Sequence, residues 1–421
     1  MPPSSDVAAD SSNSIPAAVD TAPSHPYTLS TLDPSHVDEW LDHLAASFAS
    51  KGTPRSYFHR HILHDPHLDH AGIILLHTPQ QRCVSSIRVF LRTVYVRGEA
   101  VLCGGIGEVS TQVEWRGKGF AAVCLRGGVE YMQSLGVPLS SLHTSNAAAY
   151  YQQLGWQPVE RVHGLLAIDH IPAANTATGS DYVVQQLTGS ELTSSPLLPS
   201  LMSLYDSYAR QFNGPVVRTA EYWQRWVHAE HEAVAATPSP VVVLVATTTA
   251  ASTSDVCGYA FLQRVDNKPI TVQRVAPPST SVSISSRLLV REFACSESEM
   301  SRDGGRALLL SLLHHSLHST DAFHSPQSPD APPYVQYALP IALSFRPPLD
   351  SEYEHVDSGF MYRPIEAVLA GQESSTPTEG QKSRYERKDF AHLSQRSGGQ
   401  LLAVMHADGR SKHVFFATDA F

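Results

Sequence analysis

Charged side chains are scarce in this sequence, at 17% of 421 residues, and no apolar run approaches the length of a membrane-spanning helix. The first residues, MPPSSDVAADSSNS, have neither the basic nor the apolar region of a secretory signal. A net charge of −10 works against binding to nucleic-acid phosphates or anionic lipids. We therefore expect a cytoplasmic, or nuclear, protein with no nucleic-acid or membrane partner.

Cysteines are few as well. There are five, an odd number, and no two have C-x-x-C spacing. This favours reduced, buried thiols over a disulfide framework or a zinc site. The 22 histidines are scattered, and the closest group, His314, His315 and His318, lies on an apolar stretch with helical spacing. We expect that group to flank a helix, and we predict no metal site.

The length suits two domains, and 42% apolar residues supply two cores. Residues 1–25 are rich in Ser, Ala and Pro and predict a disordered tail. Residues 26–168 form a first domain, 169–181 a Pro/Ala/Thr-rich linker, and 182–421 a second lobe that repeats a similar element order more loosely. The second lobe contains a polar insertion at about 371–386. Alternating strands and helices in both halves predict an α/β protein with mixed sheets.

Periodicity places the elements of each half. In the first half we expect strands at 27–29, 72–77, 84–96, 100–113, 139–143 and 156–166, and helices at 34–48, 54–63, 120–135 and 147–154. In the second half we expect strands at 182–187, 241–247, 256–265, 287–295, 341–345 and 359–362, and helices at 197–210, 219–228 and 307–317. A last hairpin would pair 401–405 with 413–416.

One turn indicates chemistry. The residues Arg116-Gly117-Lys118-Gly119-Phe120-Ala121 follow a strand and open a helix. Glycines there let backbone N–H groups converge, and the helix N-terminus adds unpaired donors and a positive dipole end, which together suit a diphosphate. Arg116 and Lys118 would neutralise its charge. A glycine-rich turn without a ligand explains the same six residues, and the turn is neither a Walker A loop nor G-x-G-x-x-G.

The neighbouring segments strengthen the first interpretation. The hexapeptide resembles the R/Q-x-x-G-x-G/A signature of the GNAT N-acetyltransferases, and the strand before it ends in Glu108-Val109-Ser110-Thr111-Gln112-Val113. Tyr151-Gln152-Gln153-Leu154-Gly155-Trp156 resembles the family's Y-x-K-x-G-F segment, with Gln153 at the usual lysine and Trp156 at the usual phenylalanine. The resemblance covers roughly residues 27–168.

Within that superfamily the chain resembles the Eis-like, two-lobed acetyltransferases, whose second lobe is a degenerate GNAT repeat. Gly304-Gly305-Arg306 precedes a helix in the second lobe but lacks the full signature, so no cofactor is expected there. The chain departs from the Eis pattern after about residue 365, where the residues are too few and too polar for a full sterol-carrier-like domain.

The resemblance implies site residues. Acetyl-coenzyme A would bind a bulged strand and the turn, through Ser110, Thr111, Gln112, Val113, Arg116, Gly117, Lys118, Gly119, Phe120 and Ala121. Tyr151 would protonate the departing thiolate, or it simply packs beside Tyr150. Glu108 would be the general base, or a strand-edge charge facing water or pairing with Arg88 or Arg92. His143 is a further base candidate, against an ordinary structural histidine.

The last residue offers another base. Eis-like enzymes and N-myristoyltransferases use a buried terminal carboxylate, and the apolar end of this chain places Phe421 as a candidate catalytic residue. A terminal strand that completes the second lobe is the alternative. The sequence therefore predicts an acetyl-CoA-dependent N-acetyltransferase that acts on a primary amine, of a small molecule or a peptide, by direct attack. The alternative is a non-catalytic GNAT-fold protein that binds coenzyme A or acts as a regulatory or interaction module.

Overall fold

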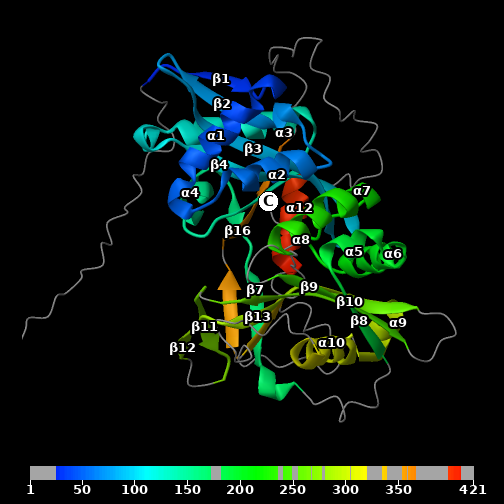
Figure 1. The fold of residues 1–421 in the computed structure, drawn as a ribbon. Helices are drawn as coiled ribbons and strands as arrows, with labels where there is room; N and C mark the ends of the chain where they lie inside the picture. Colours follow the sequence, from blue (N-terminus) through cyan, green and yellow to red (C-terminus); the bar gives the residue numbers. More distant parts are fainter. Residues whose placement is uncertain are drawn as a thin grey trace, which may run out of the picture.

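The computed structural model describes residues 25–171, 182–235, 240–248, 255–266, 268–276, 280–303, 305–319, 334–338, 353–357, 359–366 and 397–408. Two mixed sheets, each with its own helices, form two lobes (Figure 1). The predicted α/β architecture with two lobes is thereby confirmed. No helix among the described residues is both long enough and apolar enough to cross a membrane.

The first sheet has the strand order β1-β2-β3-β4-β5-β16-β6. Its strands are β1 (Thr28–Thr31), β2 (Ile73–Thr78), β3 (Gln81–Val96), β4 (Glu99–Thr111), β5 (Leu139–His143), β16 (Phe360–Pro364) and β6 (Gln157–Pro158). Helix α3 (Phe120–Ser134) packs on one face with α4 (Ala148–Gln153). Helices α1 (Val37–Ser47) and α2 (Arg55–His64) contribute to a separate core with β2, on the opposite face.

The second sheet has the order β12-β11-β15-β7-β14-β13-β10-β9-β8. Its strands are β12 (Ser281–Ile284), β11 (Ile270–Arg274), β15 (Tyr353–Asp357), β7 (Arg161–Ala167), β14 (Tyr334–Ala338), β13 (Arg287–Cys295), β10 (Val256–Val265), β9 (Val241–Thr248) and β8 (Tyr182–Leu187). Its helices are α5 (Gly189–Ser194), α6 (Leu198–Ala209), α7 (Ala220–Tyr222), the π-helix η6 (Trp223–Val227), α8 (His228–Ala235), α9 (Glu297–Asp303) and α10 (Arg306–Ser319).

The two lobes exchange strands. β7 follows the first lobe in sequence but pairs with β14 and β15 in the second sheet, whereas β16 pairs with β5 and β6 in the first. The predicted division between 26–168 and 182–421 therefore does not separate the sheets. Sequence periodicity marks a strand but not its partners, and each sheet is completed by a strand from the other half of the chain.

The β3–β4 hairpin reaches into the second lobe. Its tip turns at Arg97 and Gly98, whose φ of 48° and 79° are the positive values that a two-residue hairpin turn requires. Tyr95 N–H donates to Pro215 O at 2.8 Å, and Gly214 N–H donates to Tyr95 O at 2.8 Å. This backbone pairing joins the hairpin to the segment before α7.

The chain after β16 differs from its prediction. Residues 401–405 lie inside a helix, α12 (Gly398–Asp408), so the predicted last hairpin is wrong at its first strand. Leu401, Leu402 and Met405 are all buried, and their spacing suits one face of a helix. Figure 1 shows α12 between the two sheets, beside α8. The predicted tail at 1–24, most of the linker, the strand at 341–345, the insertion at 371–386, the segment 413–416 and Phe421 lie outside the described residues.

Candidate active site

β4 and β5 part at their carboxyl ends. Their parallel pairing runs from Cys103↔Leu139 to Ile106↔Leu142 and stops there, although β4 continues to Thr111. On the β5 side, residues 107–111 of β4 therefore pair with no other strand of the described chain. We call this place the β4–β5 splay. An exposed strand edge of this kind can hydrogen-bond an extended ligand as a neighbouring strand would.

A β-bulge lies at the start of the splay. The register of β3 and β4 shifts between Ser86↔Ser110 and Arg88↔Gly107, which adds one residue to β4. Glu108 sits in the bulge with a φ of 53°, rare for a residue other than glycine. Ile106 packs on α3, yet Glu108 and Ser110 contact α2 and α1. The bulge thus turns a carboxylate toward the α1/α2 face, where the second lobe begins.

The predicted backbone donors of 110–113 are not equivalent. Gln112 N–H donates to Val84 O at 3.0 Å, and Gln112 Nε2 donates to Cys83 O at 3.1 Å. Gln112 N–H is thus paired within the sheet, toward β3, and the predicted contact of this residue with the cofactor stays a prediction. Because successive N–H groups point to opposite edges of a strand, Thr111 N–H points to the splay instead.

The side chain of Ser110 belongs to a buried polar network. Its hydroxyl lies 2.8 Å from His43 Nε2 and 2.8 Å from the hydroxyl of Ser86, which accepts a hydrogen bond from Trp40 Nε1 at 3.0 Å. Burial lowers the pKa of His43 to about 4, so the ring is neutral at neutral pH. The network fixes the end of β4 against α1.

The predicted cofactor turn has the backbone that its glycines suggested. Gly117 and Gly119 have φ of 74° and 79°. Gly119 is the N-cap of α3, and no side chain caps the first turn of this helix. The first N–H groups of a 15-residue helix are thus left without a side-chain acceptor at the end of the splay.

The side chains of the cofactor turn each contact a different part of the first lobe. Arg116 donates from Nε to Thr111 O at 3.1 Å and from Nη2 to Ser47 O at 3.2 Å, so it braces the turn instead of extending to a ligand. Lys118 Nζ lies 4.3 Å from the centre of the Trp115 ring. The Phe120 ring is buried in the core, which leaves its backbone N–H as its means of contact with a ligand.

The corresponding helix of the second lobe is already capped. Gly305 has a φ of 85° before α10, but the Asp303 carboxylate accepts from Gly305 N–H at 3.0 Å and from Ala307 N–H at 2.9 Å. The chain's own carboxylate occupies the donors that a diphosphate would need. This is a physical reason to expect no cofactor at this position.

Glu108 is buried, which rules out the alternative of a strand-edge charge facing water. Its side chain is 4% exposed, and Oε1 lies 3.0 Å from Nδ1 of His61 in α2. Oε2 is 3.8 Å from Arg88 Nη1 and has no hydrogen-bond partner among the described residues. Arg88 and Arg92 each contact Asp65, at 2.7 and 3.0 Å. Glu108 therefore pairs with Arg88, as the alternative of a partner for that arginine predicts, while its Oε2 accepts no hydrogen bond from the described residues.

Tyr151 lies on α4, which follows β5. Its ring is 5.3 Å from that of Tyr150 and 6.2 Å from that of Trp156, and it packs on the same hydrophobic cluster as Val109, the neighbour of Glu108. Burial raises the pKa of Tyr151 to about 12, so the phenol keeps its proton at neutral pH. The ring thus packs beside Tyr150, as the packing interpretation expects, and the role of Tyr151 as an acid stays a prediction.

His143, at the end of β5, is exposed and paired. Its Nε2 lies 3.2 Å from Asp357 Oδ2 in β15, and Arg161 donates to the same oxygen at 2.7 Å. Although burial opposes it, the hydrogen bond from His143 and the charge of Arg161 hold the pKa of Asp357 below its usual value. No local sequence pattern points to Asp357 at this place, because its strand is distant in the chain.

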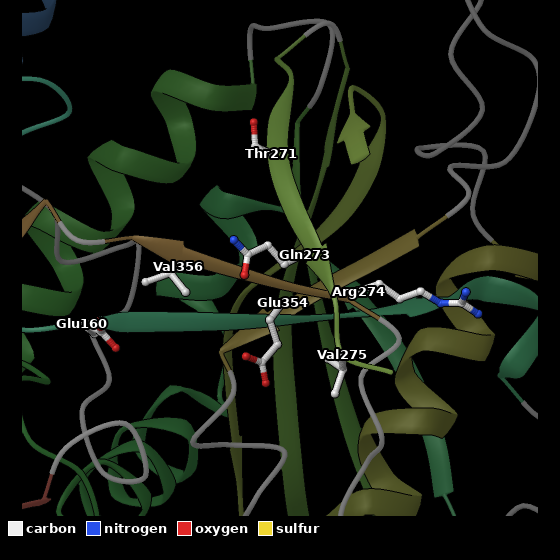
Figure 2. A pocket seen from close by; sticks show the side chains of 7 residues that line it. All are labelled: Glu160, Thr271, Gln273, Arg274, Val275, Glu354 and Val356. Carbon is white, nitrogen blue, oxygen red and sulfur yellow. The ribbon is translucent and has the colours of Figure 1, made fainter. Parts of the chain in front are cut away.

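A pocket of about 600 Å³ lies on the second sheet, where Figure 2 shows Gln273 beside Glu354, with Glu160 and Arg274 nearby. It contains none of the predicted site residues. Among the described residues, no group of three or more His, Cys, Asp or Glu side chains is placed to hold a metal ion.

Comparison with known proteins agrees with this geometry. Residues 28–159 match the family model described as an acetyltransferase (GNAT) domain. This part of the chain is therefore similar to a GNAT acetyltransferase domain. A search of curated proteins finds no significant match.

Solved structures extend the similarity of the GNAT domain to the whole fold. The chain resembles a GCN5-related N-acetyltransferase from Kribbella flavida (17% identity, TM-score 0.53, 80% of this chain and 71% of that one). It also resembles one from Anabaena variabilis (12% identity, TM-score 0.54, 81% of this chain and 73% of that one). A third similar structure is Eis1 from Mycobacterium abscessus (12% identity, TM-score 0.51, 81% of this chain and 74% of that one). Because these matches extend far beyond the GNAT domain, they confirm the two-lobed, Eis-like fold.

Proposed function

We propose that this GNAT protein transfers the acetyl group of acetyl-coenzyme A to a primary amine by direct attack. The observation that carries the proposal is the β4–β5 splay, which ends at the uncapped N-terminus of α3. A strand edge and a helix N-terminus in line suit an extended amide-containing chain that ends in a diphosphate.

The cofactor would lie along β4. Its diphosphate would accept hydrogen bonds from the backbone N–H groups between Gly117 and Ala121, with the ammonium of Lys118 nearby. Its pantetheine arm would pair with the edge that includes Thr111 N–H. No metal takes part in this scheme.

The chemistry requires one base and one acid. The amine nitrogen attacks the thioester carbonyl carbon, and Glu108 Oε2 takes the proton that the nitrogen loses. As the tetrahedral intermediate collapses, the C–S bond breaks and Tyr151 gives its phenolic proton to the sulfur. Two observations support these roles: the buried Oε2 of Glu108 accepts no hydrogen bond from the described residues, and the phenol of Tyr151 is protonated.

The carboxylate of Phe421 is the competing base. The placement of α12 between the sheets supports it, because the chain enters this region before its last residues. A tag appended after Phe421 distinguishes the two candidate bases. If Glu108 is the base, the tagged protein keeps its turnover. If the terminal carboxylate is the base, the tagged protein loses its turnover.

The acceptor class follows from charge alone. A net charge of −10 favours cationic acceptors such as polyamines or lysine side chains, and disfavours nucleic acids and anionic membranes. The test is to incubate the protein with acetyl-coenzyme A and a panel of such amines, and to identify acetylated products by mass spectrometry. Glu108→Gln serves as the inactive control. Binding of acetyl-coenzyme A without any acetylated product would favour the non-catalytic alternative.

A further inference from the structure

We propose that the second lobe acts on the base of the first: Glu230 of α8 and His61 of α2 form, with Glu108, a carboxylate–imidazole–carboxylate array that positions Glu108. The inference rests on the proposed role of Glu108. It assigns His61 and Glu230 as positioning residues, and it gives the second lobe a part in the reaction.

The array crosses the boundary between the lobes. His61 Nδ1 lies 3.0 Å from Glu108 Oε1, and His61 Nε2 lies 3.9 Å from Glu230 Oε1. Arg60, next to His61 on α2, contacts the same Glu230 oxygen from both Nε and Nη2 at 3.1 Å. One imidazole thus faces a carboxylate of each lobe.

The ring of His61 is held on its faces as well. Its centre is 4.3 Å from that of Tyr57 and 5.1 Å from that of Trp226 in the π-helix η6. The side chains of His61 and Glu108 are 3% and 4% exposed, and that of Glu230 is 18% exposed. A buried imidazole packed in this way cannot turn its nitrogens to other partners. π-Helices often occur at functional sites, which fits the position of Trp226.

The separation of 3.0 Å between Nδ1 and Oε1 requires a proton between the two atoms. With that proton on Nδ1, His61 donates to the ionised form of Glu108 and opposes the effect of burial on this carboxylate. Oε1 is then fixed, and Oε2 is left to take the proton of the amine. On the other side of the ring, Glu230 Oε1 faces Nε2 at 3.9 Å.

Other charged and titratable groups face the array. Arg88 lies 3.8 Å from Glu108 Oε2, and Arg60 pairs with Glu230. Arg291 of β13 is attracted to Glu230. Burial, with the negative charges of Glu230 and Glu108, raises the pKa of Tyr57 to about 12, so this phenol stays neutral. Arginine side chains keep their positive charge near neutral pH, so the arginines and the two carboxylates together set the electrostatic surroundings of His61.

The first test needs no turnover. In protein labelled with 15N-histidine, the ring signals of His61 are assigned by their loss in His61→Asn, and their pH midpoint is measured. Glu230→Gln removes a negative charge beside the ring, so the midpoint falls by about half a pH unit or more. Glu232→Gln changes an exposed carboxylate on the same helix and leaves the midpoint in place. An unchanged midpoint in Glu230→Gln overturns the inference.

The second test uses turnover. His61→Leu removes the hydrogen-bond donor to Glu108 Oε1, so the ionised carboxylate loses a stabilising hydrogen bond and the acid limb of kcat/KM moves to higher pH. In His61→Leu we expect kcat to fall while KM for acetyl-coenzyme A stays constant. His61→Asn keeps an N–H group at the place of Nδ1 and restores most of kcat. If His61→Leu is folded and active and the acid limb of its kcat/KM profile does not move, the inference fails. If the wild-type protein acetylates no amine, the proposed function fails, and the first test still shows whether Glu230 acts on His61.

Discussion

The Nδ1 atom of His61 lies 3.0 Å from Oε1 of Glu108, at the residue of β4 whose backbone has left-handed φ. A non-glycine residue in that conformation costs free energy, on the order of 1–3 kcal/mol. Here the strained residue also carries a buried carboxylate oxygen that accepts no hydrogen bond from any residue the structure describes. Strain and an unused acceptor at one residue indicate a functional role.

Replacing Glu108 tests that role. Glu108→Gln keeps the shape of the side chain but removes the base, so kcat falls by about 10²–10⁴-fold with little change in KM for acetyl-coenzyme A. Glu114→Gln, an exposed carboxylate just after β4, is the matched control and keeps wild-type turnover. Steady-state kinetics decide the point, and equal kcat in the two variants would exclude Glu108 as the base.

Tyr151 can be separated from its neighbour in the same way. Tyr151→Phe removes only the phenolic oxygen, so turnover falls by about 10²-fold or more while cofactor affinity is kept. Tyr150→Phe makes the same change one residue earlier on α4 and leaves turnover near the wild-type value. Measured kcat and the dissociation constant for acetyl-coenzyme A distinguish loss of acid from loss of packing, and unchanged turnover in Tyr151→Phe would remove it from the mechanism.

The cofactor turn depends on Gly119. Gly119→Ala places a Cβ at a φ of 79° and lowers stability by about 1 kcal/mol. Because the change also displaces the first N–H groups of α3, we expect affinity for acetyl-coenzyme A to fall at least about tenfold. Gly136→Ala, at the other end of the same helix with a φ of 68°, has the same backbone cost. Calorimetric titration should show weaker binding in Gly119→Ala alone, and equal affinities would place the cofactor elsewhere.

The pKa of His43 gives a prediction on stability. Burial lowers it to about 4 in the folded protein, against 6.5 for an ordinary histidine. Between pH 6.5 and 4 the unfolded chain takes up a proton that folded His43 does not, so stability falls as the pH falls through this window, by about 1 kcal/mol per pH unit. Urea unfolding of His43→Gln should show a flatter pH dependence than the wild type, and parallel curves would contradict the burial of a neutral ring.

The local parts of this site could be predicted from sequence. Gly117 and Gly119 mark a turn that only glycine adopts easily, and the strand Val256–Val265 is bounded as its pattern predicts. The direction of Gln112 could not be predicted, because a bulge shifts the register by one residue and the bulge depends on the pairing with β3.

Contacts between residues far apart in the chain could not be predicted from the sequence either. His61 and Glu230 come from helices far apart in the chain, and no local pattern links them. The same holds for β7 and β16, whose exchange between the sheets depends on tertiary pairing alone. The short strands β14 and β15 were missed because isolated runs of five residues have little periodicity.

Direct transfer at the β4–β5 splay is tested most directly by a single-turnover experiment. Protein loaded with acetyl-coenzyme A is mixed with an acceptor amine, and free thiol, acetylated amine and acetylated protein are followed together. Thiol and acetylated amine should appear with one rate constant and without acetylated protein, because no enzyme nucleophile takes part. Thiol release that precedes the product and leaves an acetyl group on the protein, or no release at all with amine present, would contradict the account.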